Sequence, residues 1–287
     1  MSLFYIYFPL FGTMVIVIQC ADQVGLVAKI SGLLAEKKFN IVSMHEYVDN
    51  GENLFFMRLE VVNEPGLELL GQQLRDLLPT GALVKVNPNP EKKAIVLVTK
   101  EYHCLADILV RNHFKTLGAS VQCVIGNYTH LEDITKRFDI PFYHVPFGDP
   151  ATNPEKQILD IIAGYEHDYL VLAKFMRVLS PDFVGRFPNQ IVNIHHSFLP
   201  AFAGANPYRQ AYERGVKLIG ATAHFVTNDL DEGPIIAQQI ISADHSLTAA
   251  DMVKAGKEIE TAVLAKALRV VFDDRVFIYK NKTVVLE

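Results

Sequence analysis

The stretch from Ile191 to Ser242 decides the fold of the larger part of this chain: IVNIHHSFLPAFAGANPYRQAYERGVKLIGATAHFVTNDLDEGPIIAQQIIS. It opens with a short apolar run, and two further runs, KLIGATAHFVT and GPIIAQQIIS, are expected to pair as strands. Upstream, the runs AIVLVT, VQCVIG, FYHVP and YLVLA alternate with helix-like segments. This alternation predicts βαβ units, and hence a Rossmann-like α/β fold with a mostly parallel sheet and helices on both faces.

The same stretch contains the polar groups that best predict a reactive site. Asn193 and His195 lie one residue apart at the end of an apolar run, and His224 and Asp231 follow. Ligands of parallel sheets bind at the carboxyl ends of the strands. An amide, an imidazole and a carboxylate can together polarise a carbonyl, stabilise an oxyanion and transfer a proton. None of these side chains is a good nucleophile here, so the pattern indicates acyl-group chemistry in which a water or an amine attacks.

A separate, smaller module is predicted ahead of this region. Residues 13–88 contain an apolar strand, a helical segment, two alternating strands joined at Asn50-Gly51, a second amphipathic helix and a last strand. The order βαββαβ is the ferredoxin-like arrangement. The sequence VNPNPEKK then interrupts regular structure with two prolines and several charges. We therefore expect one domain at residues 1–88, a linker at 89–93 and a second domain at 94–287.

Composition narrows the class of protein. A formal net charge of -5 over 287 residues argues against a nucleic-acid partner, which would require a basic surface. Cys20, Cys104 and Cys123 are scattered and form no CxxC pair, so neither a disulfide framework nor a zinc site is predicted. No other metal-ligand cluster is visible, and we expect no metal. A reducing cytoplasm is the natural location for such a chain.

The first 20 residues, MSLFYIYFPLFGTMVIVIQC, carry no charge. They lack the basic start and the cleavage site of a signal peptide, and Pro9 and Gly12 interrupt them as a membrane span. We expect a buried strand from Thr13 to Gln19 behind a short apolar leader, and no membrane partner. The sequence leaves open whether residues 1–12 belong to the native protein.

Several separated motifs resemble one family in the same order along the chain. NIHHSFLPAF, GANPY, GATAHFV and DEGPII are similar to the motifs of the formyltransferase fold in enzymes that use 10-formyltetrahydrofolate, with His196 where most of that family has proline. The turn DQVG in the first module resembles the D-R-P-G turn of ACT domains. An ACT domain ahead of this catalytic domain is similar to the formyltetrahydrofolate deformylases. The resemblance implies hydrolysis of 10-formyltetrahydrofolate to tetrahydrofolate and formate, which feed one-carbon and purine metabolism.

The resemblance also implies roles for individual residues. Asn193, His195 and Asp231 match the catalytic trio. Asn193 and His195 would stabilise the oxyanion, and Asp231 would keep His195 protonated and orient it and the attacking water. The expected folate-binding residues are Phe175, Met176, Arg177, Val178, Leu179, Thr227, Asn228, Leu230, His196 and His224, and His224 would also buttress Asp231. The folate is then the substrate, and no cofactor is expected.

The ACT resemblance implies a regulatory site and self-association. Asp22, Gln23 and Gly25 match the turn at which ACT domains often bind an amino acid at a subunit interface. The alternative is that these residues form only a strand-to-helix turn. Because the edge strands of so small a sheet need covering, we expect a homo-oligomer, either a dimer or a tetramer.

Two observations favour water as the acceptor of the formyl group. The related glycinamide ribonucleotide transformylases hold the phosphate of their acceptor in a loop rich in glycine and serine. The matching segment here, AIVLVTKEYHCLADIL, contains no glycine, and the chain has no basic C-terminal extension of the kind that binds transfer RNA. Two alternatives stay open: transfer of the formyl group to a small unphosphorylated amine, and a sensor protein that has lost catalysis.

Overall fold

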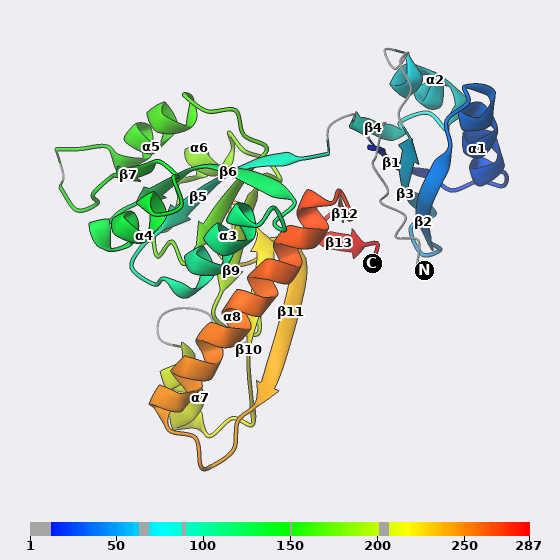
Figure 1. The fold of residues 1–287 in the computed structure, drawn as a ribbon. Coiled ribbons are helices and arrows are strands. Elements are labelled where there is room, and N and C mark those ends of the chain that lie inside the picture. Colours follow the sequence, from blue (N-terminus) through cyan, green and yellow to red (C-terminus); the bar gives the residue numbers. More distant parts are fainter. Residues whose placement is uncertain (1–12, 63–68, 88–89, 150, 201–206) are drawn as a thin grey trace, which may run out of the picture. The chain divides into compact units, whose positions relative to one another are not determined.

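The computed structural model describes residues 13–62, 69–87, 90–149, 151–200 and 207–287 (Figure 1). They form two compact units, and the division between the units falls after residue 90. The first unit also includes residues 273–277 and 285–287, whereas the second comprises residues 91–272 and 278–284. The leader predicted at residues 1–12 lies outside the described residues.

The first unit has the predicted βαββαβ order. Its elements are β1 (Thr13–Ala21), α1 (Leu26–Glu36), β2 (Ile41–Asp49), β3 (Leu54–Val62), α2 (Leu70–Leu77) and β4 (Leu83–Asn87). The four strands form an antiparallel sheet in the order β2-β3-β1-β4. Met14, Ile16 and Ile18 alternate along β1 and pack with residues of helical spacing on α1 and α2, so one face of the sheet is buried under both helices.

The second unit is built on a seven-stranded sheet in the order β11-β10-β9-β8-β5-β6-β7. The strands from β9 to β7 are parallel, and β10 and β11 continue the sheet in antiparallel pairing, as predicted for the two apolar runs around Asp231. Their bounds are β5 (Lys92–Val98), β6 (Ala119–Gly126), β7 (Phe142–His144), β8 (Tyr169–Ala173), β9 (Ile191–His195), β10 (Leu218–Phe225) and β11 (Ile235–Ser242).

Helices cover both faces of this sheet (Figure 1). They are α3 (His103–His113), α4 (Glu132–Lys136), α5 (Pro154–Ile162), α6 (Pro181–Val184), α7 (Pro207–Arg214) and α8 (Ala249–Phe272), with a short turn of helix η1 (Thr129–Leu131). Ile95 and Leu97 of β5 share a core with α5 and α6. Their neighbour Val96 is buried on the opposite face, where α3 packs against α8.

The last two strands, β12 (Val276–Tyr279) and β13 (Lys282–Val285), form a separate two-stranded sheet. Around it, within the first unit, the buried Arg58 donates from Nε to the Asp273 carbonyl at 2.6 Å. Asp274 accepts from Lys85 Nζ at 3.2 Å and from Asn87 Nδ2 at 3.1 Å. Residues that follow α8 therefore complete the structure of the N-terminal unit.

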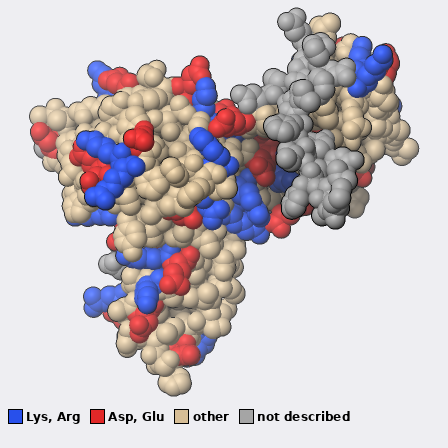
Figure 2. Space-filling view, viewed as in Figure 1, with Lys and Arg blue, Asp and Glu red and all other residues tan. Residues whose placement is uncertain are grey.

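Charged groups of both signs lie next to one another on the face of the second unit shown in Figure 2. Interspersed charges of this kind do not make the basic stripe that follows a nucleic-acid backbone. Among the described helices, none combines the length and the apolar character that crossing a membrane requires.

Candidate active site

A cavity of about 270 Å³ opens at the carboxyl ends of β8 and β9. Three segments line it: residues 172–179 after β8, residues 193–196 at the end of β9, and residues 224–231 after β10. The structure thereby brings together all the residues for which the sequence predicted catalysis or folate binding. These are Asn193, His195, Asp231, Phe175, Met176, Arg177, Val178, Leu179, Thr227, Asn228, Leu230, His224 and His196.

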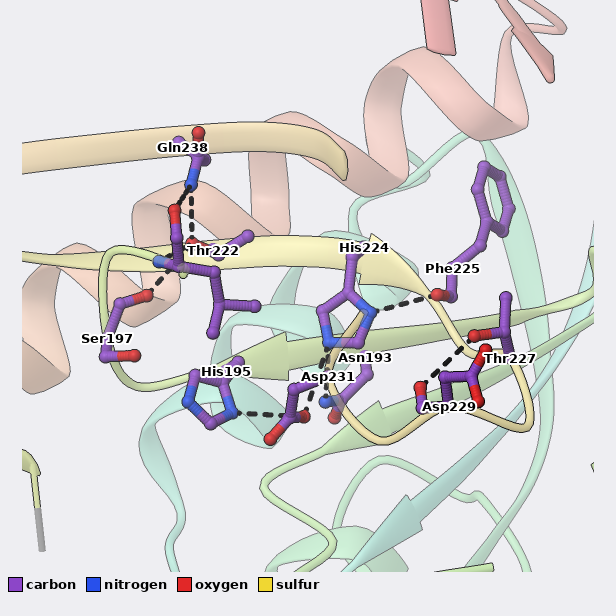
Figure 3. A network of polar contacts seen from close by, with 11 residues as sticks. Asn193, His195, Ser197, Thr222, His224, Phe225, Thr227, Asp229, Asp231 and Gln238 are labelled. Atoms are coloured by element: carbon purple, nitrogen blue, oxygen red, sulfur yellow. Dashed lines mark hydrogen bonds and ion pairs between the residues drawn. The ribbon is translucent and has the colours of Figure 1, made fainter. Parts of the chain in front are cut away.

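His195 and Asp231 form the centre of this site (Figure 3). The His195 Nδ1 atom lies 3.2 Å from Asp231 Oδ1, and the His195 side chain is buried. The hydrogen bond from His195 holds the pKa of Asp231 well below its usual range although burial opposes this shift. The other ring nitrogen, His195 Nε2, is buried and has no hydrogen-bond partner among the described residues. A buried nitrogen without a partner, in a residue that lines a cavity, is placed to meet a substrate.

Asn193 is oriented by His224. The His224 Nδ1 atom lies 2.9 Å from the carbonyl oxygen of Phe225, which can only accept, so this nitrogen carries the hydrogen. The lone pair of His224 Nε2 then accepts from Asn193 Nδ2 at 3.2 Å. The same nitrogen lies 3.7 Å from Asp231 Oδ1, beyond hydrogen-bond distance. His224 therefore orients the Asn193 amide, and the second N–H of this amide makes no hydrogen bond to the residues that the structure describes.

The loop that carries Asp231 is fixed at both ends. Val226 N donates to the Ile191 carbonyl at 2.9 Å, and Phe225 N donates to the Pro234 carbonyl at 2.9 Å. A Cβ atom at Gly233 would lie 1.8 Å from the Phe225 carbonyl oxygen, so only glycine allows this approach. Asp231 itself has a φ of 58°, which Asp tolerates better than most residues. These contacts hold the carboxylate against His195.

Thr222 fixes the turn that follows His195 (Figure 3). The sequence alone did not predict this role. The fully buried Thr222 hydroxyl donates to the Ser197 carbonyl at 2.9 Å and accepts from Leu199 N at 3.1 Å and from Gln238 Nε2 at 2.9 Å. The Thr222 hydroxyl thus uses its one donor position and both of its acceptor positions. Thr222 and Gln238 face each other in the register of β10 and β11, and this polar pair in two apolar strands was the available signal.

The segment after β8 forms the other wall of the cavity. Phe175 is buried in the core, whereas Met176 and Val178 expose 51% and 71% of their surface. Met176 N donates to Thr99 Oγ1 at 2.9 Å, which joins this segment to the end of β5. The Arg177 guanidinium lies over the Phe147 ring, 5.3 Å from its centroid. Exposed apolar side chains beside a buried polar centre suit a flat aromatic ligand.

His196 points to a second group of polar residues. Its ring lies 5.1 Å from that of His195 and 6.3 Å from that of Tyr208. Burial, and next the charge of Lys174, lower the pKa of His196 to about 4, so the ring is neutral near neutral pH. Lys174, which the sequence reading also missed, lines the cavity beside it.

The predicted regulatory residues lie in the first unit, between β1 and α1. Asp22 N donates to the Asn53 carbonyl at 2.9 Å, and Gly25 precedes α1 with a φ of 88°. Gln23 lies between them on the same exposed turn. The structure thus shows a strand-to-helix turn, and a ligand there stays a prediction.

Comparison with known proteins agrees with this architecture. Residues 92–268 match the formyl transferase family and residues 14–79 match the ACT domain family. The formyltetrahydrofolate deformylase of Escherichia coli O6:H1 is 48% identical over 93% of this chain and 96% of its own length, and that of Bacillus subtilis is 39% identical over 94% and 92%.

Solved structures give the same result. A formyltetrahydrofolate deformylase from Pseudomonas syringae pv. tomato superposes with a TM-score of 0.90 at 38% identity, over 96% of this chain and 94% of that one. A glycinamide ribonucleotide transformylase from Symbiobacterium toebii matches 69% of this chain with a TM-score of 0.66 at 28% identity. The two-unit architecture is shared with the first structure over nearly its whole length. The chain belongs to the formyltetrahydrofolate deformylase family.

Proposed function

We propose that this protein hydrolyses 10-formyltetrahydrofolate to tetrahydrofolate and formate, the reaction for which its relatives are named. One observation carries the proposal beyond the family name. The cavity holds an imidazole nitrogen of His195 that is buried and has no hydrogen-bond partner in the described part of the chain, together with an oriented amide of Asn193 and an ionised Asp231. These groups serve an acyl transfer to water without a covalent intermediate.

The proposed reaction begins with binding of the formyl group beside Asn193 and His195. The free N–H of Asn193 and His195 Nε2 donate to the formyl oxygen, and these bonds strengthen as the oxygen becomes negative in the tetrahedral intermediate. Asp231 accepts from His195 Nδ1 and thereby turns Nε2 toward the substrate. No covalent bond to the enzyme is required.

Collapse of the intermediate completes the proposed reaction. A bond forms between the water oxygen and the formyl carbon, and the bond from that carbon to N10 breaks. The water gives up one proton on balance to N10, which yields formic acid, and this acid releases a second proton to solvent to give formate. As an imidazolium, His195 can give its Nε2 proton to N10 as this bond breaks and regain one from the hydroxyl that came from water, because Nε2 is the ring nitrogen without a partner among the described residues. Asp231 remains ionised throughout, as its lowered pKa favours.

The direct test supplies purified protein with 10-formyltetrahydrofolate alone and measures tetrahydrofolate and formate together. We expect equal amounts of both products without any amine, and we expect Asp231→Asn to abolish them. Formate that appears only after an amine is added would replace hydrolysis by formyl transfer. Tight folate binding with no product would instead indicate a sensor.

We also propose self-association and a cytoplasmic location. Strands β2 and β4 are the edges of the small sheet, and each has one side without a strand partner in the described structure. A dimer or a tetramer would cover these edges, with an amino-acid effector bound near Asp22, Gln23 and Gly25. Light scattering after size-exclusion chromatography tests this, and a monomer at micromolar concentration would contradict it.

A further inference from the structure

A second cavity of about 260 Å³ adjoins the first, and Lys174, Met176 and His196 belong to the walls of both. Its wall carries three strongly basic side chains, Lys174, Arg209 and Lys257. It also lies where α3 begins, and the start of a helix favours negative charge. Such a cavity would ordinarily attract a small anion. In this chain, however, carboxylates of the protein itself already contact the cations.

The buried cation of the second cavity is matched by Glu260 of α8. Lys174 Nζ lies 3.1 Å from Glu260 Oε2, and both side chains are almost fully buried. Two further groups contact this carboxylate, His103 Nε2 at 2.8 Å and the Tyr208 hydroxyl at 2.8 Å. Burial opposes ionisation of Glu260, but the contacts of His103, Lys174 and Tyr208 prevail and lower its pKa to about 2. Three donors thus surround one carboxylate, as they would surround a bound anion.

Lys174 has an unusual backbone conformation at the edge of the sheet. Its φ is 61°, a conformation that glycine adopts freely and lysine only at a cost. The residue follows β8 directly at the carboxyl edge of the sheet.

The second lysine of the cavity is matched by Glu101, in the loop between β5 and α3. Lys257 Nζ lies 2.6 Å from Glu101 Oε2, and the two side chains are 34% and 42% exposed. The hydrogen bond to Glu101 raises the pKa of Lys257. Arg209 pairs with Glu213 of its own helix at 2.9 Å. Each of the three basic groups therefore has an acidic partner.

A metal ion is not needed to explain this cluster. His103, Cys104 and Glu260 do place three possible ligand atoms within 4.8 Å of one another. Burial, and next the charge of Glu260, raise the pKa of the Cys104 thiol well above its usual range, so it stays protonated. The ammonium group of Lys174 already supplies a cation to the carboxylate.

We infer that Glu101 and Glu260 determine the acceptor in this reaction: they occupy the anion-binding positions of the second cavity, so that amines carrying a phosphate are excluded and water reaches the formyl carbon. The inference rests on the proposed hydrolysis and adds the residues that select its acceptor. The absence of a glycine-rich loop removes backbone donors for a phosphate, and the two carboxylates fill the remaining cationic positions. The exclusion is therefore electrostatic.

Two variants of the full-length protein test the inference, Glu101→Gln and Glu260→Gln. Each keeps the shape of the side chain and removes its charge, which leaves Lys257 or Lys174 for an external anion. The probe is inorganic phosphate, titrated against chloride at equal ionic strength, and the readout is the thermal midpoint. We expect phosphate to raise the midpoint of both variants and to bind about tenfold more tightly than to the unaltered protein. Lys257→Met, added to Glu101→Gln, should remove the gain.

Glu132→Gln provides the matched control. Glu132 pairs with Lys136 on α4 at 2.6 Å and is about as exposed as Glu101, but neither residue lines the two cavities. A phosphate response no greater in Glu101→Gln and Glu260→Gln than in Glu132→Gln would overturn the inference, and so would equally tight binding to the unaltered protein. If Glu260→Gln does not fold, Glu101→Gln alone decides, because its partly exposed side chain can lose its charge without unfolding the unit.

The reaction supplies a separate measurement. 2-Aminoethyl phosphate should inhibit formate release in Glu101→Gln at concentrations that leave the unaltered protein unaffected, and equal inhibition of both proteins would contradict the inference. Failure of the proposed function is distinguishable, because the thermal measurement needs no turnover. A gain of phosphate binding without any formate would refute hydrolysis and leave the filled anion site standing.

Discussion

The two adjoining cavities differ in how their polar groups are paired, although His103 Nδ1 in the second is also buried without a hydrogen-bond partner among the described residues. In the first, the buried Nε2 of His195 has no partner among the described residues, and Asn193 keeps one N–H free. In the second, each lysine meets a carboxylate, and Glu260 alone collects contacts from Lys174, His103 and Tyr208. Lys174 and His196 line both cavities, so a single layer of side chains separates the unpartnered groups of the first cavity from the ion pairs of the second.

This difference between the cavities indicates how a fold that several enzymes share can be restricted to one acceptor of the formyl group. An unpartnered buried polar group is unfavourable in the free protein, and a ligand that satisfies it gains binding energy. A group that already has its partners gives nothing to a ligand, which would have to displace them first. The first cavity is therefore prepared for the formyl group, whereas the second is closed to anions by its own carboxylates.

The largest expected effect comes from removing the unpartnered nitrogen. His195→Ala should lower kcat about a thousandfold, since a positioned acid or base commonly contributes between a hundredfold and ten-thousandfold. KM for the folate should change little, because the apolar wall from Phe175 to Leu179 stays intact. Steady-state formate release together with folate binding measures both. A His195→Ala protein with near-normal kcat would remove this residue from the mechanism.

A smaller effect on turnover is expected when the Asp231 carboxylate is kept but displaced. In Gly233→Ala the new Cβ atom would collide with the Phe225 carbonyl, so the loop carrying Asp231 must move. A displacement of about 1 Å can lower turnover roughly a hundredfold. Gly32→Ala on α1, where a Cβ meets nothing within 4 Å, is the control. Unchanged kcat in Gly233→Ala would mean that the loop adapts without moving the carboxylate away from His195.

Part of this architecture could be predicted from local sequence patterns and motifs. Asn193 and His195 end a buried parallel strand, so their placement at the carboxyl edge of the sheet follows from the βαβ order. Asp231 follows β10, which runs antiparallel to β9, so its return to His195 depends on the path of the loop after β10. The hairpin at Asn50-Gly51 also formed, although its turn spans residues 50–53 and uses the Asp49 carboxylate as acceptor for Gly51 N. Such features depend on neighbours in the sequence.

The second cavity could not be predicted in the same way. His103 and Glu260 are 157 residues apart, and only the packing of α3 against α8 brings them together. Nothing in the run YLVLAKF marks Lys174 as a residue with positive φ. Charge pairs of this kind depend on tertiary structure, so spacing along the chain carries no signal for them.

Thr222→Val tests whether the turn after His195 contributes to stability alone or also to turnover. The substitution keeps the shape but removes the hydroxyl that serves Ser197, Leu199 and Gln238. Leaving the buried Leu199 N–H and Ser197 carbonyl without partners should lower the free energy of unfolding by about 3 kcal/mol. Denaturant unfolding measures this. Because the turn follows His195 directly, kcat should fall as well, and a loss of stability without any change in kcat would show that the turn does not position the imidazole.

The smallest effect is expected in the second cavity. Tyr208 packs its ring against Gly256, where an added Cβ would lie 2.2 Å from the ring, and its hydroxyl donates to Glu260. Tyr208→Phe removes one of three donors to a buried carboxylate and should cost about 1.5 kcal/mol of stability at pH 7. Tyr212→Phe, on the exposed side of the same helix, is the control and should cost nothing measurable.

The pH dependence of the Tyr208→Phe effect identifies its cause. The pKa of Glu260 is lowered to about 2 in the folded protein, so its ionisation contributes stability above the ordinary carboxyl value of about 4.3, and this contribution is lost as pH falls toward the folded value. The difference between Tyr208→Phe and the unaltered protein should therefore be full at pH 7 and shrink below about pH 4. A difference independent of pH would assign the loss to packing. Turnover should stay within about twofold, because with Lys174 and His103 still in place the carboxylate keeps the anion position filled.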